Sequence, residues 1–193
     1  MVRNLLITSS CIFYTFIGLI SSHPQEGKPF RQVAGFAWEI QQGYSVDFKI
    51  NNFGLPVKGN FTGLKGNVFF DPDHPESGKF EVNIQVNTIN TGISKRDKDL
   101  MAAKYFDEAT YPTIHFQSEK ISKAEAGFMV LGTITIKGKP VKIAFPFTFS
   151  KTENTGTFRS TFTLHRKDFG IGDKGGPMGN DIDVELSVPV RKG

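Results

Sequence analysis

Side chains that could perform catalysis or bind a metal are few in this sequence and are spread along it. The four histidines are far apart: His23, His74, His115 and His165. They form none of the close pairs that metal-binding motifs contain. The single cysteine is Cys11, and the sequence shows no Ser/His/Asp signature of a nucleophilic enzyme. These residues favour a protein that is not an enzyme and holds no metal or cofactor.

Two segments contain ligand-type residues but are explained more simply. Asp71-Pro72-Asp73-His74 offers oxygen and nitrogen ligands, yet Pro and Asp at this spacing are typical of a turn. Residues 170–179 are rich in glycine but lack the Gly-Lys-Ser/Thr ending of a phosphate-binding loop. We interpret the first segment as a turn and the second as a flexible loop.

Composition points to a large apolar interior. The chain of 193 residues has 19 Phe against 4 Tyr and 1 Trp, and bulky flat rings bury much apolar area. The formal net charge is +4 and the isoelectric point is about 9.1. Without a block of Lys and Arg, this mild excess indicates no nucleic-acid partner. It would permit peripheral contact with a membrane of anionic lipids, although ordinary solubility explains it equally well.

The N-terminus has the pattern of a signal peptide over residues 1–22. Arg3 supplies the positive charge, an apolar stretch follows, and Ser22 suits the residue before a cleavage site. Ile20 suits its position poorly, so a retained anchor is the alternative. Cleavage would remove Arg3 and Cys11, giving a net charge of 22 − 19 = +3 and no disulfide. We expect an exported protein, periplasmic or secreted, with a linker over residues 23–35 and one folded domain over residues 36–191.

From Phe36 onward, apolar and polar residues alternate with period two, which indicates strands with one buried face. The apolar sets are Tyr44/Val46/Phe48/Ile50, Phe80/Val82/Ile84/Val86, Phe128/Val130, Ile134/Ile136, Ile143/Phe145/Phe147/Phe149, Phe158/Phe162/Leu164 and Ile182/Val184/Leu186/Val188. Turn residues lie between them: Gly127, Lys137-Gly138, Asn154-Thr155-Gly156 and Gly175-Gly176. We therefore predict an all-β fold of about eight antiparallel strands.

One segment, residues 94–105, departs from this alternation and predicts a helix of about three turns. Ser94 is expected to cap it, with Asp97 in a weaker capping-box role. A single closed β-barrel accounts for the strands best, because closure removes exposed edges, but a sandwich has the same periodicity. Pro146, inside the Phe-rich strand, predicts a bulge or an edge-like position.

A set of short motifs, in a fixed order, carries a resemblance to a known family. They include Ser45-Val46-Asp47-Phe48, Val57-Lys58-Gly59-Asn60-Phe61, Phe70-Asp71-Pro72, Asn90-Thr91-Gly92, Arg96-Asp97-Lys98-Asp99-Leu100, Tyr105-Phe106-Asp107, Tyr111-Pro112-Thr113-Ile114-His115-Phe116 and Arg166-Lys167-Asp168-Phe169-Gly170. Together they resemble the YceI-like family over Trp38 to Val190. The resemblance implies a lipocalin-like barrel that holds a polyisoprenoid or similar amphiphilic lipid. Gln41, Asn52 and Asp99 depart from that pattern, which leaves the headgroup's identity open.

Fold and resemblance together predict the residues of a lipid site in the barrel interior. The expected lining is Phe48, Ile50, Phe61, Phe80, Val82, Ile84, Phe116, Phe128, Ile134, Phe145, Phe147, Phe149, Phe158 and Phe162. Arg96 and Arg166 are candidate headgroup contacts, although pairing with Asp97, Asp168 or backbone carbonyls is the simpler role. The alternative functions are a ligand-free interaction module with a solid Phe-rich core, and an unrecognised hydrolase of the bound lipid. The sequence leaves the oligomeric state open, a dimer included.

Overall fold

The computed structural model describes residues 35–193. The expected signal peptide, residues 1–22, and all of the expected linker except Gly35 lie outside the described residues. The elements, in chain order, are β1 Phe36–Ile40, β2 Ser45–Asn52, β3 Leu55–Phe61, β4 Leu64–Phe70, η1 Pro75–Ser77, β5 Lys79–Gln85, η2 Val86–Thr88, β6 Ile89–Asn90, α1 Ser94–Met101, β7 Thr113–Ala124, β8 Gly127–Ile136, β9 Lys139–Lys151, β10 Thr155–His165 and β11 Met178–Lys192.

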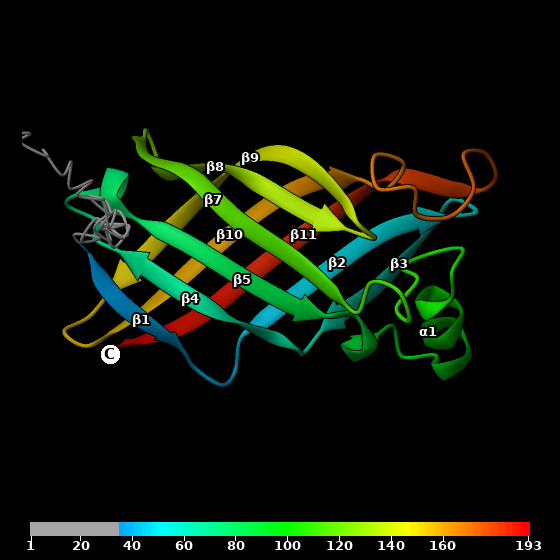
Figure 1. Ribbon diagram of the computed structural model, residues 1–193, viewed down its shortest axis with the longest axis horizontal. Helices are drawn as coiled ribbons and strands as arrows, with labels where there is room; N and C mark the ends of the chain where they lie inside the picture. Colours follow the sequence, from blue (N-terminus) through cyan, green and yellow to red (C-terminus); the bar gives the residue numbers. More distant parts are fainter. Residues whose placement is uncertain (1–34) are drawn as a thin grey trace, which may run out of the picture. The chain divides into compact units, whose positions relative to one another are not determined.

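The strands form a closed antiparallel barrel, as the alternation predicted (Figure 1). The ring runs β1-β4-β5-β7-β8-β9-β10-β11 and returns from β11 to β1. Strands β2, β3 and β6 extend it: β2 pairs with the first part of β11, β3 with β2, and β6 with the end of β3. This arrangement confirms the eight-stranded barrel and excludes the sandwich.

Helix α1 is shorter than predicted and is capped differently. It ends at Met101 because Ala102 is already extended, and its N-cap residue is Ile93 rather than Ser94. Asp97 takes no part in a capping box, since its carboxylate accepts hydrogen bonds from the backbone N–H of Thr91, at 2.9 Å, and from the Thr91 hydroxyl. Asp97 thus fastens the start of the helix to the turn that follows β6.

One end of the barrel is filled with aromatic rings. Phe70, at the end of β4, has no exposed surface, and the rings around it have centroids 5.0–5.9 Å away: Phe80, Phe128, Phe147, Phe149 and Phe158. Trp38 closes the cluster through its indole N–H, which donates to the Phe70 carbonyl at 2.9 Å. We call this the closed end; it contains the β9–β10 turn (Figure 1).

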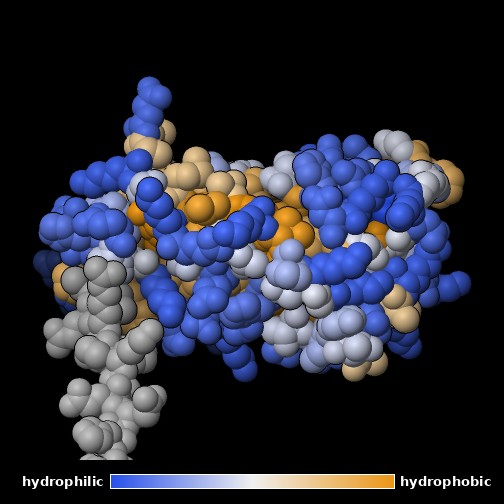
Figure 2. Space-filling model, turned by 45° about the horizontal axis from the view of Figure 1, so that its top comes forward, coloured by the Kyte–Doolittle hydropathy of each residue, from blue (hydrophilic) through white to orange (hydrophobic). Residues whose placement is uncertain are grey.

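The opposite end of the barrel carries α1 and the long connection from β10 to β11 (Figure 1). We call this the α1 end. The face of the barrel drawn in Figure 2 is mostly hydrophilic, with an apolar strip along it. A sheet wetted on its outer face and apolar on its inner face is what strict alternation requires.

Candidate functional site

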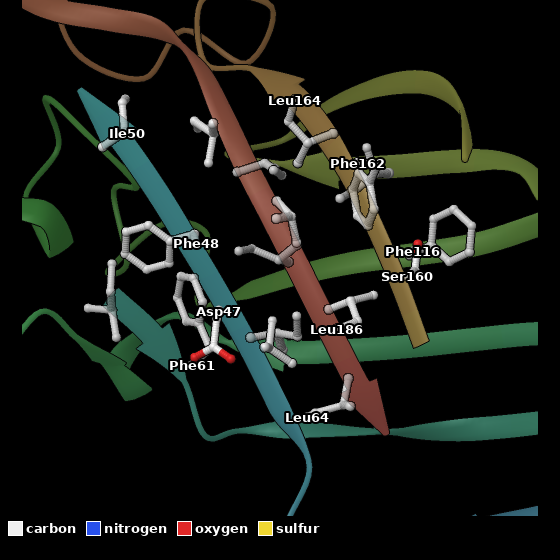
Figure 3. Close-up of a pocket in the computed structure, with 18 of the residues that line it drawn as sticks. Asp47, Phe48, Ile50, Phe61, Leu64, Phe116, Ser160, Phe162, Leu164 and Leu186 are labelled. Atoms are coloured by element: carbon white, nitrogen blue, oxygen red, sulfur yellow. The ribbon is translucent and has the colours of Figure 1, made fainter. Parts of the chain in front are cut away.

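An apolar cavity of about 350 Å³ lies within the barrel, toward the α1 end. Its wall consists of the inward side chains of the strands, as for Phe48 and Ile50 on β2, Phe162 and Leu164 on β10, and Leu186 on β11 (Figure 3). The volume falls in the range of about 300–1,000 Å³ that is usual for small-molecule sites. The structure therefore has a hollow half and a solid half.

All but two of the side chains predicted for the interior site line this cavity. Those that do are Phe48, Ile50, Phe61, Phe80, Val82, Ile84, Phe116, Ile134, Phe145, Phe147, Phe158 and Phe162. Phe128 and Phe149 point inward but lie in the closed end, with ring centroids 5.0 and 5.3 Å from that of Phe70. Their alternation phase is as predicted, but Phe70 already fills the interior at their level.

Other lining residues were not singled out from the sequence as a site. Some belong to the same alternation, such as Ile143, Ile182 and Val188, and were assigned only to a buried face. A second group comes from outside the strands: Leu100, Tyr105, Phe106 and Ile171. Period-two alternation cannot find such residues; the sequence signals were the motif that ends at Leu100 and the Tyr105-Phe106-Asp107 motif after the helix.

The second group belongs to a structure that covers the α1 end, which we call the mouth cover: α1, the turn at residues 102–106 and the loop at residues 166–177. Its parts are joined by hydrogen bonds. Gly172 N–H donates to the Lys104 carbonyl at 3.0 Å, and the Lys137 ammonium donates to the carbonyls of Ala103 and Gly170 at 2.7 and 3.3 Å. The mouth cover is thus one connected unit resting on the β8–β9 turn.

An ion pair crosses the mouth cover as well. Lys104 Nζ lies 2.6 Å from an Asp173 carboxylate oxygen, and both side chains are largely exposed. The hydrogen bond and the charge of Asp173 raise the pKa of Lys104 above its ordinary value. Because both groups reach water, this pair helps to position the loop and adds little to the stability of the fold.

Arg166 is buried, with 1% of its surface exposed, and organises the loop from inside. Its guanidinium donates only to backbone carbonyls: Nε to Gly179 at 2.6 Å, Nη1 to Ile171 and Asp173 at 2.7 Å each, and Nη2 to Met178 at 2.9 Å. These use four of its five N–H donors. Of the two roles considered from the sequence, the structure shows carbonyl binding, and Asp168 is not its partner.

Arg96 lies on α1 and lines the cavity while being only partly buried. Its Nε and Nη2 donate to the hydroxyl and carbonyl of Thr91 at 2.8 Å each. Nη1 makes no hydrogen bond within residues 35–193, so this nitrogen is available to a ligand. Asp99, one of the departures noted in the sequence, lines the cavity at the same end.

Three further charged or titratable side chains, Glu119, Asp183 and His115, are each paired with another side chain. Lys142 lowers the pKa of Glu119, and Lys49 lowers the pKa of Asp183, each chiefly through a hydrogen bond. His115 Nδ1 lies 2.9 Å from the Asn83 amide oxygen. Across residues 35–193, no group of three or more His, Cys, Asp or Glu side chains is arranged to hold a metal ion.

Within the same residues, no helix has the length and hydropathy needed to cross a membrane. A closed antiparallel barrel whose interior is partly hollow and apolar is a lipocalin-like architecture. A model of the YceI-like domain matches residues 38–190, so the chain belongs to the YceI-like family.

Relatives and solved structures agree with this assignment. The chain is 29% identical over 150 residues to a UPF0312 protein of Yersinia pestis (74% of this chain, 78% of the relative), and 32% identical over 151 residues to one of Azotobacter vinelandii (74% and 79%). Its fold is similar to Burkholderia cenocepacia BcnA, with a TM-score of 0.72 and 24% identity over 76% of this chain and 95% of that one. It is also similar to a polyisoprenoid binding domain from Saccharophagus degradans, with a TM-score of 0.66 and 13% identity over 82% and 99%.

Proposed function

We propose that this protein binds a long apolar lipid of the polyisoprenoid class in the barrel cavity and carries or stores it unchanged. The observation that carries the proposal is the cavity itself, which is lined almost wholly by apolar side chains and lies inside a closed barrel. Burial of each methylene contributes about 0.8 kcal/mol. A tail of a few isoprene units would offset an association cost of about 4–15 kcal/mol. The Saccharophagus degradans domain, described as polyisoprenoid binding, supports the same ligand class.

The shape of the interior suggests how the lipid lies. The Phe70 cluster blocks the closed end, so the tail would point toward it and the headgroup would lie beneath the mouth cover. There the free Nη1 of Arg96 is the direct contact that we propose for a polar or anionic headgroup. Arg166 would act through its positive charge, because carbonyls occupy most of its donors.

Native mass spectrometry of the purified protein tests the proposal. We expect a co-purified prenyl or acyl lipid, or uptake of added geranylgeranyl phosphate. A matched pair of variants on β11 locates the site. Leu186→Trp places an indole in the cavity, and Glu185→Trp, at the neighbouring residue, places an indole on the exposed outer face of the barrel. Binding should be lost in the first and kept in the second.

The same measurement separates the other functions. The solid closed end is the observation that favours a ligand-free interaction module, and an apo mass that takes up no lipid would support it. Chemical change of the offered prenyl phosphate over time would instead support a hydrolase of the bound lipid. We expect the ligand to be recovered unchanged.

We also propose that the protein is exported, on the basis of the signal-peptide pattern of residues 1–22. N-terminal sequencing of the protein from its native host should then find a chain that begins near His23. Retention of Met1 in the membrane fraction would replace this with an anchored protein.

A further inference from the structure

The ladder between β9 and β10 is incomplete. The two strands pair only from Gly156 opposite Lys151 to Arg159 opposite Thr148, although β9 begins at Lys139 and β10 continues to His165. On its other side, β10 pairs with β11 along its whole length, from Thr155 to His165. Within the described barrel this leaves a seam, which we define as residues 139–147 of β9 facing residues 160–165 of β10.

Pro146 explains where the ladder stops. If the β9–β10 register continued, Pro146 would lie opposite Thr161. The Pro146 carbonyl accepts a hydrogen bond from the Ser160 hydroxyl at 2.6 Å, so the backbone of this residue faces β10. In an antiparallel pair a residue presents its N–H and its C=O to the same neighbour, and proline has no N–H. The predicted edge-like character of Pro146 is therefore found, and the edge faces β10.

Side chains close the seam in place of the backbone. The rings of Phe145 on β9 and Phe162 on β10 are stacked, with centroids 4.3 Å apart and an interplanar angle of 17°. Both rings line the cavity, as does Ser160, whose hydroxyl bridges the two strands below them. Rotation of two side chains and loss of one hydrogen bond would thus open the wall directly into the cavity.

The outer surface on the β8–β9 side of the seam carries an apolar patch. Met129 and Leu131 on β8 are 36% and 37% exposed, and their partners on β9 are the exposed Pro146 and Ala144. An apolar chain that crossed the wall beside Ala144 and Pro146 would pass between this patch and the uncharged Thr161 and Thr163 of β10, whereas Lys142, further along β9, is paired with Glu119.

Passage through the α1 end, by contrast, would require the mouth cover to separate. That would break the Gly172–Lys104 hydrogen bond, the Lys137 hydrogen bonds and the Lys104–Asp173 ion pair. We infer that the β9–β10 seam is a lateral portal, gated by Phe145 and Phe162, through which the apolar chain of the ligand enters and leaves. The inference rests on the proposed lipid-binding function.

A covalent bridge across the seam tests the portal. In a Cys11→Ser background, Ala144→Cys with Thr163→Cys places two thiols opposite each other if the β9–β10 register continues. Dibromobimane then joins them and becomes fluorescent. The matched control is Thr161→Cys with Glu185→Cys, an exposed pair across the complete β10–β11 ladder. Uptake of geranylgeranyl phosphate is followed by time-resolved native mass spectrometry, with and without the bridge.

We expect the bridged seam to load at least about tenfold more slowly, and the bridged control to load like its unbridged form. Equal loading with and without the seam bridge overturns the portal while leaving lipid binding intact. If no form takes up the lipid, the proposed function fails instead. If the two thiols react singly and do not bridge, residues 144 and 163 do not face each other, and the extended β9–β10 register on which the portal is based is wrong.

Ser160→Ala provides a second measurement that needs no cross-link. It removes the hydroxyl that bridges the strands, so exchange of bound lipid should become several-fold faster, on the order of threefold or more. Exchange at the wild-type rate or slower counts against the portal.

Discussion

Phe147 lies on the boundary between the solid and hollow halves of the barrel, which makes Phe147→Ala a sharp test of the lipid site. This residue is 4% exposed and lines the cavity. The centroid of its ring lies 5.3–5.9 Å from the ring centroids of Phe70, Phe80, Phe128 and Phe158. Truncation of a buried Phe costs about 3–5 kcal/mol, and each aromatic pair adds about 0.5–1.5 kcal/mol. We expect a loss near the upper limit, about 4–5 kcal/mol, or a fall in Tm of about 8–20 °C.

Lipid should relieve part of this loss. The void left by the ring opens into the cavity, so about two methylene-sized groups of a bound tail can fill it and recover about 1.5 kcal/mol. By linkage, the Kd of the variant for geranylgeranyl phosphate should be about tenfold lower than that of the wild type. Urea unfolding with and without saturating lipid measures both quantities.

Phe128→Ala is the matched control, since Phe128 stacks on Phe147 but does not line the cavity. Its void lies in the closed end, so its stability loss should be the same with and without lipid. Equal relief in both variants would mean that lipid stabilises the fold generally. No relief in either would mean that the interior near Phe147 admits no tail, and our placement of the ligand would be wrong.

Three further predictions follow from the mouth cover and the barrel wall. Arg166→Lys keeps the charge but lacks the fork that reaches four carbonyls, so hydrogen exchange should accelerate in residues 166–179 but not in β4. Lys104→Met should leave the unfolding midpoint almost unchanged at neutral pH, yet speed hydrogen exchange in the same loop. In the wild type the pKa of Lys104 is raised, so its contribution to stability is complete below the ordinary Lys pKa and is lost as the pH rises through the raised value. A hydrogen-exchange series at alkaline pH would detect this loss. Gly59→Ala should cost about 1–3 kcal/mol in urea unfolding and reduce lipid capacity, because its Cβ would lie 2.4 Å from Cζ of Phe48 and push that ring into the cavity.

The sequence predicts the fold well because apolar and polar residues alternate along the strands that form the barrel wall. The inward side chains of β2, β5, β8, β9, β10 and β11 follow from a period of two, and the helix α1 follows from the break in that period. Its end was less predictable, because Ala102 is extended although Ala102 and Ala103 favour a helix, and its capping was less predictable because Asp97 is held by Thr91. The ordered motifs then identified the family, which the match over residues 38–190 confirms.

The position of the cavity along the barrel was beyond such an analysis. Alternation says that a side chain faces inward but not how far along the axis it lies, so Phe147 and Phe149 look equivalent in sequence. Only the position of Phe70 shows where the cavity ends and the aromatic cluster of the closed end begins. Likewise, Pro146 predicts a missing hydrogen bond, but only the structure shows that β10 rather than β8 loses it.

The closing pair of the barrel, β1 and β11, has a consequence for the newly made protein. Trp38 pairs with Lys192, which is 192 − 38 = 154 positions later. Strands β2 and β3, and strands β7 to β10, can form hairpins as they emerge, and β1 can pair with β4, but the ring cannot close until β11 has been synthesised. A chain that is still being synthesised therefore has no closed cavity, and the proposed lipid would be acquired only by the finished domain.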